Sequence, residues 1–218
     1  MKKYTLLLSL FCIGFICSGI MPYNYGIWAG EIFPTVVGLI IIITTFKKFR
    51  YTTFTYSAIL VACYFMFIGS HYSYAREPLF EWIKNYFGQD RNNYDKLGHF
   101  VQGMVPVLIS RELFIRKIII RDAKWISFIS FCICLATTSF YEIAEYIVCT
   151  SAGADSDSFL GMQGNIWDSQ SDMLFAALGG LFIVFFLGNL HDRIIERSFP
   201  GTFEKLRSFY SKPNSPIR

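Results

Sequence analysis

Cysteine chemistry and the common motifs of soluble enzymes have little place in this sequence. Its six cysteines include no CxxC pair, and five of them fall within apolar runs, so neither a disulfide framework nor a thiolate metal site is expected. A phosphate-binding loop, a hydrolase nucleophile motif and an internal repeat are also missing. The basic residues are spread along the chain, which argues against nucleic acid as a partner.

Apolar residues make up most of what is present. The 218 residues are 53% hydrophobic and 18% aromatic, with a mean hydropathy of +0.39, which is too apolar for an ordinary soluble domain. A helix that spans a bilayer needs about 20 apolar residues. Six runs come near that length, at about 4–21, 30–46, 52–70, 97–115, 126–148 and 170–189. The sequence therefore predicts an all-α, polytopic transmembrane helix bundle.

The six runs predict one integral membrane domain, residues 1–190, followed by a basic tail, residues 191–218. The first run follows two lysines, as in a signal peptide, but no A-x-A-like cleavage site follows it, so we expect a retained helix. Six spans place both termini on one side. That side holds all but four of the 20 Lys and Arg residues, the exceptions being Arg76, Lys84, Arg91 and Lys96. The positive-inside rule therefore puts both termini in the cytoplasm.

The predicted outer loop from His71 to Tyr94 carries a helix signal of its own. Pro78 suits the first turn of a helix, apolar residues recur with a helical period, and Gly88 suits its end. We expect an amphipathic helix on the membrane surface, which either covers what lies beneath it or serves only as an aromatic anchor. Glu31, at the outer start of the second run, is expected to be a solvated helix-start acid.

Polar residues pair up near the outer ends of the last three runs. The pairs are Asp95 with His99, Glu142 with Glu145, and Asp168 with Asp172. Residues three or four apart share one face of a helix, and the three pairs fall within about two turns of one level. A charged carboxylate near the middle of a bilayer costs about 2.5–3.5 kcal/mol. Glu142 and Glu145 must therefore face a cation, a watery cavity or another polar helix.

One site for a divalent cation at the outer membrane face is the simplest prediction from these pairs. Carboxylates that share a partly dry pocket repel one another without a counter-charge or proton uptake, and a metal ion supplies that counter-charge. Oxygen-dominated ligation with a single imidazole favours Mg, Mn, Zn or non-haem Fe over Cu. The expected ligands are Asp95, His99, Glu142, Glu145, Asp168 and Asp172. The residues expected to orient these ligands or to shape the loop are Gln163, Asn165 and Gln170.

Helix capping is the alternative interpretation for part of this set. Asp95 precedes an apolar run and suits an N-cap, and Ser169-x-x-Asp172 matches a capping box. His99 can equally be a hydrogen-bonded polar residue at the membrane interface. Capping does not explain Glu142 and Glu145, because both lie well inside the fifth run.

Three strings carry a family resemblance: Tyr94 to Phe100, Tyr141-Glu142-x-x-Glu145-Tyr146, and Phe159 to Met173. Together they resemble the YjdF-type inner membrane proteins of bacteria, a family catalogued as a domain of unknown function. The resemblance covers most of the chain and implies a six-helix protein of the bacterial cytoplasmic (inner) membrane. Asn165 stands where the family commonly has Asp, which argues against an obligatory anionic role there.

A shorter string, Asp95-Lys96-x-x-His99-Phe100, is similar to VanZ-like membrane proteins, which are linked to glycopeptide-antibiotic tolerance. That similarity implies action on the cell envelope or its lipids.

Three functions fit these residues. The first is a metal-dependent enzyme that acts on a lipid head group or a lipid-linked envelope precursor, with His99, Glu142 or Glu145 as general base. The second is a proton- or cation-coupled transporter. It would need acids in the inner half of the bundle, where only Glu112 stands, beside Arg111 in what we expect to be an interfacial pair. The third is a non-catalytic scaffold in the bilayer. The sequence gives no oligomeric state.

Overall fold

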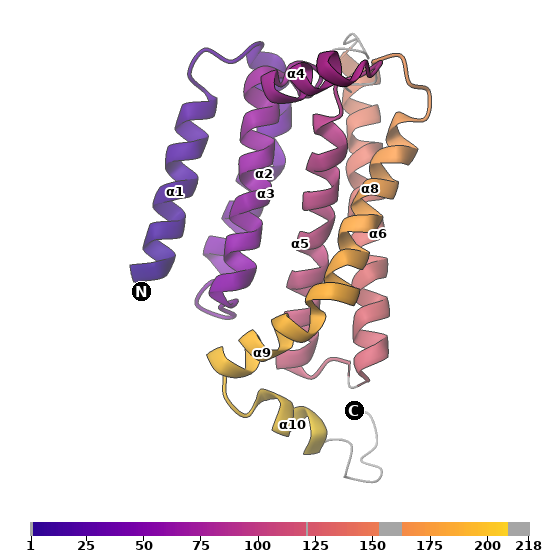
Figure 1. The fold of residues 1–218 in the computed structure, drawn as a ribbon. Coiled ribbons are helices and arrows are strands. Elements are labelled where there is room, and N and C mark those ends of the chain that lie inside the picture. The colour runs from indigo at the N-terminus through magenta and orange to yellow at the C-terminus, as the bar shows by residue number, and fades with distance from the viewer. Residues whose placement is uncertain (1, 121, 153–162, 209–218) are drawn as a thin grey trace.

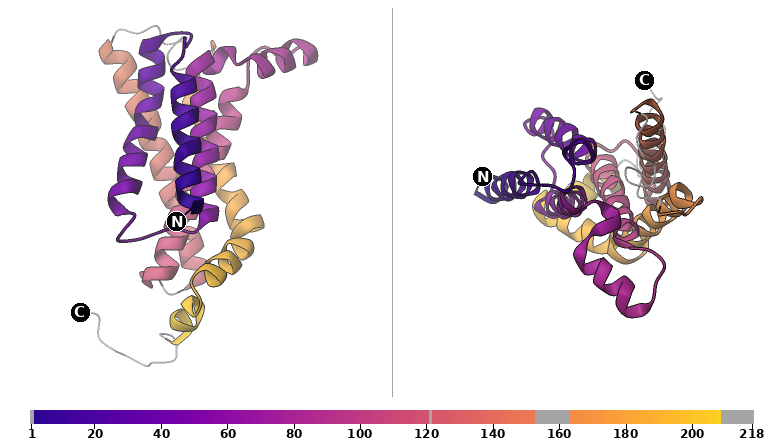
Figure 2. Two further views of the ribbon diagram at one scale, coloured as in Figure 1. Left: turned by 90° about the vertical axis from the view of Figure 1, so that its left-hand side faces the viewer. Right: turned by 90° about the horizontal axis from the view of Figure 1, so that it is seen from above.

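Helices make up the regular structure throughout the part of the chain that the computed structural model describes, residues 2–120, 122–152 and 163–208. Six helices run side by side along one bundle (Figures 1 and 2): α1 (Lys2–Ser18), α2 (Tyr25–Thr45), α3 (Thr53–Tyr72), α5 (Tyr94–Lys117), α6 (Ala123–Ala152) and α8 (Asp168–Phe182). The short η1 (Tyr74–Arg76) and α4 (Pro78–Phe87) lie at one end, which we call the α4 end. The predicted all-α class is confirmed.

The chain after α8 turns away from the bundle axis at the opposite end, which we call the α9 end (Figure 1). A π-helical turn, η2 (Ile183–Leu187), joins α8 to α9 (Gly188–Ser198), and α10 (Thr202–Ser208) follows. His191 and Ile195 of α9 are fully buried, so the start of the predicted tail packs against the bundle.

Four helices in the described residues are long and apolar enough to cross a membrane: Tyr25–Thr45, Thr53–Tyr72, Ala123–Ser151 and the continuous run Asp168–Ser198. The protein is therefore a multi-pass membrane protein. Helices α1 and α5 lie alongside these four (Figure 2). Helix α1 has only 17 residues, and α5 carries several charged side chains.

Helix α5 lies at the centre of the bundle and packs against α3, α6 and α8. Two glycines allow its backbone to touch that of α8. A Cβ atom on Gly103 would collide with the carbonyl oxygen of Ala176, and one on Gly179 would collide with that of Phe100. Small residues that bring backbones together are typical of helix pairs in membranes. This contact holds the first turns of α5 and α8 close to each other.

Glu112 holds the α9 end of the bundle together. Its buried carboxylate accepts hydrogen bonds from the backbone N–H and hydroxyl of Thr52, at 2.7 and 3.0 Å, and from the hydroxyl of Thr55 at 2.7 Å. It also pairs with Arg116 at 2.9 Å and lies 3.6 Å from His191. The expected pairing of Glu112 with Arg111 is wrong, because Arg111 pairs with Asp192 of α9 at 2.8 Å. Glu112 instead caps the start of α3 and joins it to α5 and α9.

Helix α4 forms where the sequence predicts a helix. The Glu77 side chain accepts the N–H of Phe80 at 2.8 Å, Pro78 occupies the first turn, and Gly88 ends the helix in the left-handed region at φ 64°. No residue of α4 is buried, and its exposed side chains include Leu79 and Trp82. Its place on a membrane surface stays a prediction.

Candidate functional site

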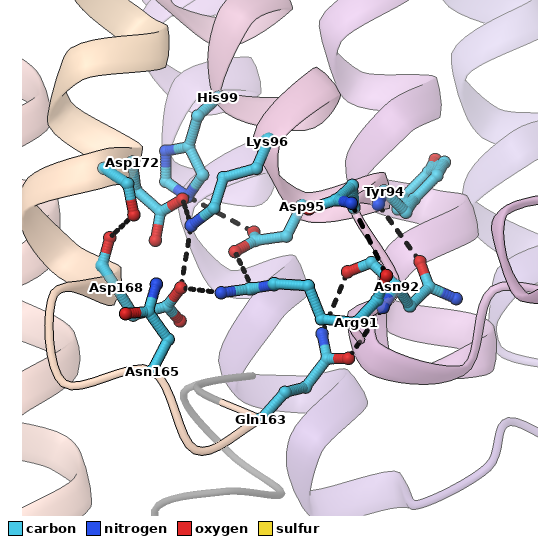
Figure 3. Close-up of polar contacts among 12 residues, drawn as sticks. Arg91, Asn92, Tyr94, Asp95, Lys96, His99, Gln163, Asn165, Asp168 and Asp172 are labelled. Carbon is cyan, nitrogen blue, oxygen red and sulfur yellow. Dashed lines mark hydrogen bonds and ion pairs between the residues drawn. The ribbon is translucent and has the colours of Figure 1, made fainter. Parts of the chain in front are cut away.

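The loop before α5 and the loop before α8 are fixed to each other at the α4 end. The Gln163 side chain accepts the backbone N–H of Asn92 and donates to the backbone oxygen of Asn92, both at 2.9 Å (Figure 3). Asn92 in turn accepts the N–H of Tyr94 through its side chain at 3.0 Å and so begins α5. Gln163 therefore positions the start of α5. The segment 159–162 of the third resemblance string lies outside the described residues.

Asp95, His99 and Asp172 form the centre of the site. One ligand atom from each lies within 4.8 Å of the others, and all three side chains are buried. His99 Nε2 lies 3.4 Å from Asp95 Oδ1 and 4.0 Å from Asp172 Oδ1. Asp95 and His99 come from successive turns of α5, and Asp172 comes from the second turn of α8 (Figure 3). The three side chains could hold a cation through two carboxylates and one imidazole.

Glu142 joins this centre from α6. Its Oε1 lies 3.8 Å from His99 Nε2, and the side chain is buried. Among the described residues, neither Glu142 Oε1 nor His99 Nδ1 has a hydrogen-bond partner. Buried polar atoms without partners are costly, so each of these two atoms has an unused capacity to form a hydrogen bond or to bind a further group.

Lys96 and Arg91 are site residues that the sequence interpretation used only as topology signals. Lys96 is buried and its Nζ lies 2.7 Å from Asp168 Oδ1 and 2.6 Å from Asp172 Oδ1. Arg91 lies 2.5 Å from the same oxygen of Asp168 and 3.9 Å from Asp95 (Figure 3). Helical spacing could have revealed Lys96, which stands three residues before His99, whereas Arg91 lies in the loop before α5 and carries no such signal.

These cations change the electrostatics expected from the sequence. Four acids, Asp95, Glu142, Asp168 and Asp172, share the two basic side chains of Lys96 and Arg91. Two negative charges therefore remain unbalanced unless the site binds protons or a cation. Asp168 is held by Lys96 and Arg91 and stands outside the group of three potential ligands. A bound metal would share Asp172 with Lys96.

Capping does not account for Asp95 or Asp172. The N-cap residue of α5 is Asn93 and that of α8 is Trp167, and neither N-cap position shows a side-chain capping bond. Asp95 instead faces His99 and Arg91, and Asp172 faces Lys96.

Glu145 lies one turn beyond Glu142 on α6, half-buried and next to Tyr141. The Tyr141 hydroxyl donates to Glu31 of α2 at 3.3 Å, and the rings of Tyr141 and His99 meet edge to face at 6.2 Å.

Glu31 is only 6% exposed, so the expectation of a solvated helix-start acid is wrong. Burial raises the pKa of Tyr74 in η1 well above its ordinary value, and the nearby charge of Glu31 raises it further. Tyr141, Glu31 and Glu145 extend the polar site from α6 to α2.

Two of the residues expected to support the site lie at its edge. The Asn165 side chain accepts the N–H of Trp167 at 3.1 Å, and its backbone oxygen accepts the N–H of Asp168 at 3.2 Å, so it shapes the start of α8. Gln170 is exposed on α8. Neither position requires a negative charge.

The fold and the site define a multi-pass membrane protein with a buried, charged site at one end of its helix bundle. The family described as predicted membrane protein (DUF2238) matches residues 3–193, and the chain belongs to that family. The chain is also similar to Inner membrane protein YjdF of Escherichia coli (strain K12), with 36% identity over 182 residues, 84% of this chain and 87% of that protein. The resemblance to YjdF-type proteins is thereby confirmed. No solved structure matches the chain at a significant level.

Proposed function

We propose that the chain crosses the inner membrane six times, through α1, α2, α3, α5, α6 and the run from α8, with both termini in the cytoplasm. All but four of the Lys and Arg residues then lie on the cytoplasmic side. The polar site and α4 fall on the outer side. Trp82 and Tyr86 stack on α4 with their ring centroids 5.3 Å apart and are exposed, which suits a helix lying in the membrane interface.

The site binds a divalent cation through Asp95, His99 and Asp172, with Glu142 as a further ligand or as the acceptor of a proton from bound water. The observation that supports this proposal is the convergence of three buried ligand atoms within 4.8 Å, beside a buried Glu142 oxygen that lacks a hydrogen-bond partner among the described residues. Zn, Mg or Mn suits this donor set.

With this cation site the protein acts as an enzyme on a lipid head group or a lipid-linked envelope precursor in the outer leaflet. When bound, the cation would polarise a substrate oxygen and lower the pKa of bound water. Glu142, whose Oε1 lies 3.8 Å from His99 Nε2, would take up the proton of that water as general base, because a His99 nitrogen that binds the cation has no lone pair left for a proton. Lys96 and Arg91 are already paired with aspartates, so the bound cation would be the group that meets the phosphate of a head group.

Lipid and envelope-precursor profiling of a deletion strain tests the proposed enzymatic activity. The strain is complemented with the wild type, with His99→Ala, or with Gln170→Ala as the control at an exposed position of the same end. We expect one lipid or precursor pool to change on deletion, to recover with the wild type and Gln170→Ala, and to stay changed with His99→Ala. Full recovery with His99→Ala would contradict the proposal.

Ion-coupled transport is a second candidate, and the buried Glu112 and His191 at the α9 end favour it. They supply ionisable groups on the inner half of the bundle, which the transport hypothesis needs. The apolar cluster of Val107, Leu108, Cys134 and Ile183 lies between the two polar regions, so a path would have to open through it. An unchanged lipid profile together with an altered ion uptake that depends on Glu112 would favour the transporter.

A further inference from the structure

A groove opens between α1, α2 and α3 towards the α9 end, away from the polar site. Its volume is about 490 Å³. Apart from Lys47 and a few hydroxyl groups its lining is apolar: Tyr4, Thr5, Leu7, Leu8 and Phe11 of α1, Leu39, Ile42, Ile43 and Thr44 of α2, Phe46 and Lys47 after it, and Tyr56, Ile59 and Leu60 of α3. No carboxylate of the described residues lines it.

Helix packing explains why the groove exists. Helices α1 and α2 both pack against α3. They meet towards the α4 end, where Trp28 donates to the Ser18 hydroxyl at 3.1 Å and its ring lies 5.8 Å from that of Phe15. They meet again near the α9 end, where the rings of Tyr4 and Phe46 are 5.3 Å apart. The groove lies between these two aromatic contacts, and several of its walls, including Leu8 and Ile43, are exposed.

The dimensions of the groove suit one acyl chain. Leu39 and Lys47 are eight residues apart on α2 and the turn after it, which corresponds to about 12 Å along a helix. One leaflet contributes about 15 Å of hydrocarbon, half of the bilayer core. A lipid whose head group lies at Lys47 would therefore place its chain along the groove over most of one leaflet.

The charges at the mouth of the groove select the head group. Lys47 lines the groove, and the Arg50 guanidinium lies over the rings of Tyr4 and Phe46, at 5.5 and 4.9 Å from their centroids. Lys2, Lys3 and Lys48 add positive charge in the same segments, whereas Glu31, the only acid among the first 76 residues, is buried beside Tyr141. Among the described residues, no carboxylate forms an ion pair with Lys47 or Arg50 within 4 Å. Basic groups beside pockets between transmembrane helices bind anionic lipid head groups.

We propose that this groove is a binding site for one anionic phospholipid, with an acyl chain between α1 and α2 and the head-group phosphate at Lys47 and Arg50. The lipid completes the packing of α1, which otherwise has apolar contacts mainly with α3. This site is independent of the polar site at the α4 end.

Native mass spectrometry of the full-length protein, delipidated in detergent and titrated with phosphatidylglycerol or phosphatidylcholine, tests the proposal. The wild type should bind one phosphatidylglycerol in preference to phosphatidylcholine. Lys47→Ala with Arg50→Ala should weaken phosphatidylglycerol binding on the order of thirty-fold, since each basic group contributes about one factor of five to six. Ile43→Trp fills the groove and keeps the charges. It should abolish the preference for phosphatidylglycerol over phosphatidylcholine.

Lys84→Ala is the matched control, because Lys84 is a basic residue on α4 at the other end of the molecule. It should bind phosphatidylglycerol as the wild type does. Both groove variants change exposed or lipid-facing side chains, and an unchanged elution volume and helical circular dichroism show that they are folded. Equal binding of the two lipids by the wild type, or an undiminished preference in both groove variants, would overturn the proposal.

Discussion

Lys96 shows at the scale of one residue how a charged side chain is tolerated in this bundle. It is buried, and its ammonium group contacts Asp168 and Asp172 at 2.7 and 2.6 Å. Removing one partner of a buried ion pair is strongly destabilising, because the other charge is left uncompensated.

Lys96→Met should therefore lower the free energy of unfolding by about 3–5 kcal/mol. Lys84→Met is the control, since its pair with Glu81 is partly exposed and should contribute less than about 1 kcal/mol. Unfolding of the purified variants in detergent mixtures, followed by circular dichroism, measures both. Equal stability of the two variants would show that Lys96 does not hold the aspartates.

The residues of the site were only partly predictable from the sequence. Spacing within one helix identifies Asp95 with His99 and Asp168 with Asp172, because helical periodicity is a local property. Lys96 was missed because a basic residue in a loop next to a span also serves as a topology signal. Glu31 was missed because its burial depends on Tyr141, which is 110 residues away in the chain.

Two glycines control the contact between α5 and α8 at the scale of the helices. Gly103→Ala forces the α8 backbone at Ala176 to move, and because the obstacle is a carbonyl group rather than a flexible side chain, relief is costly. We expect a loss of roughly 3 kcal/mol or more in the free energy of unfolding. Because the two helices carry Asp95, His99 and Asp172, any cation binding at the site should weaken as well.

Gly38→Ala is the matched control for Gly103→Ala. Gly38 lies within α2, and a Cβ there meets nothing within 4 Å. Alanine favours a helix by up to about 1 kcal/mol over glycine, so this variant should be as stable as the wild type or slightly more stable. A Gly103→Ala protein that unfolds like Gly38→Ala would contradict the close contact.

Glu112 controls the contacts between helices at the α9 end, as the two glycines do between α5 and α8. Glu112→Ala removes the acceptor of Thr52, Thr55 and Arg116 at once and leaves buried donors unsatisfied. We expect a loss of about 3–5 kcal/mol in the free energy of unfolding. Glu204→Ala, at an exposed position in the first turn of α10, should change it by less than about 1 kcal/mol. Chemical unfolding of the two variants under identical conditions distinguishes them, and a mild effect of Glu112→Ala would rule out its capping role.

At the scale of the whole molecule, hydropathy predicts that the chain is a helical membrane bundle, but it does not say which helices are neighbours. The runs follow from local composition. The packing of α5 against α8 arises from Gly103 and Gly179, whose role becomes visible only when the two helices are side by side. The bundle and a shared site for its last three spans can therefore be predicted from the sequence, whereas the contribution of α2 through Glu31 and the backbone contact between α5 and α8 need the structure.

Reporter fusions test the proposed orientation of the whole molecule. A green fluorescent protein joined to the C-terminus should fluoresce, because it folds in the cytoplasm, and alkaline phosphatase fused after Gly88 should be active, because that enzyme needs the oxidising periplasm. In the reverse fusions, phosphatase at the C-terminus should be inactive and fluorescent protein after Gly88 should not fluoresce. The opposite pattern would place the polar site on the cytoplasmic side.

The metal content of the purified protein tests the proposed cation site most directly. Inductively coupled plasma mass spectrometry is applied to the wild type, Asp95→Asn, His99→Ala and the exposed control Gln170→Ala, all purified without chelators. We predict about one equivalent of a divalent metal in the wild type and in Gln170→Ala, and a large loss in Asp95→Asn and His99→Ala. A wild-type protein without metal, or equal metal in all four proteins, would contradict the proposed cation site.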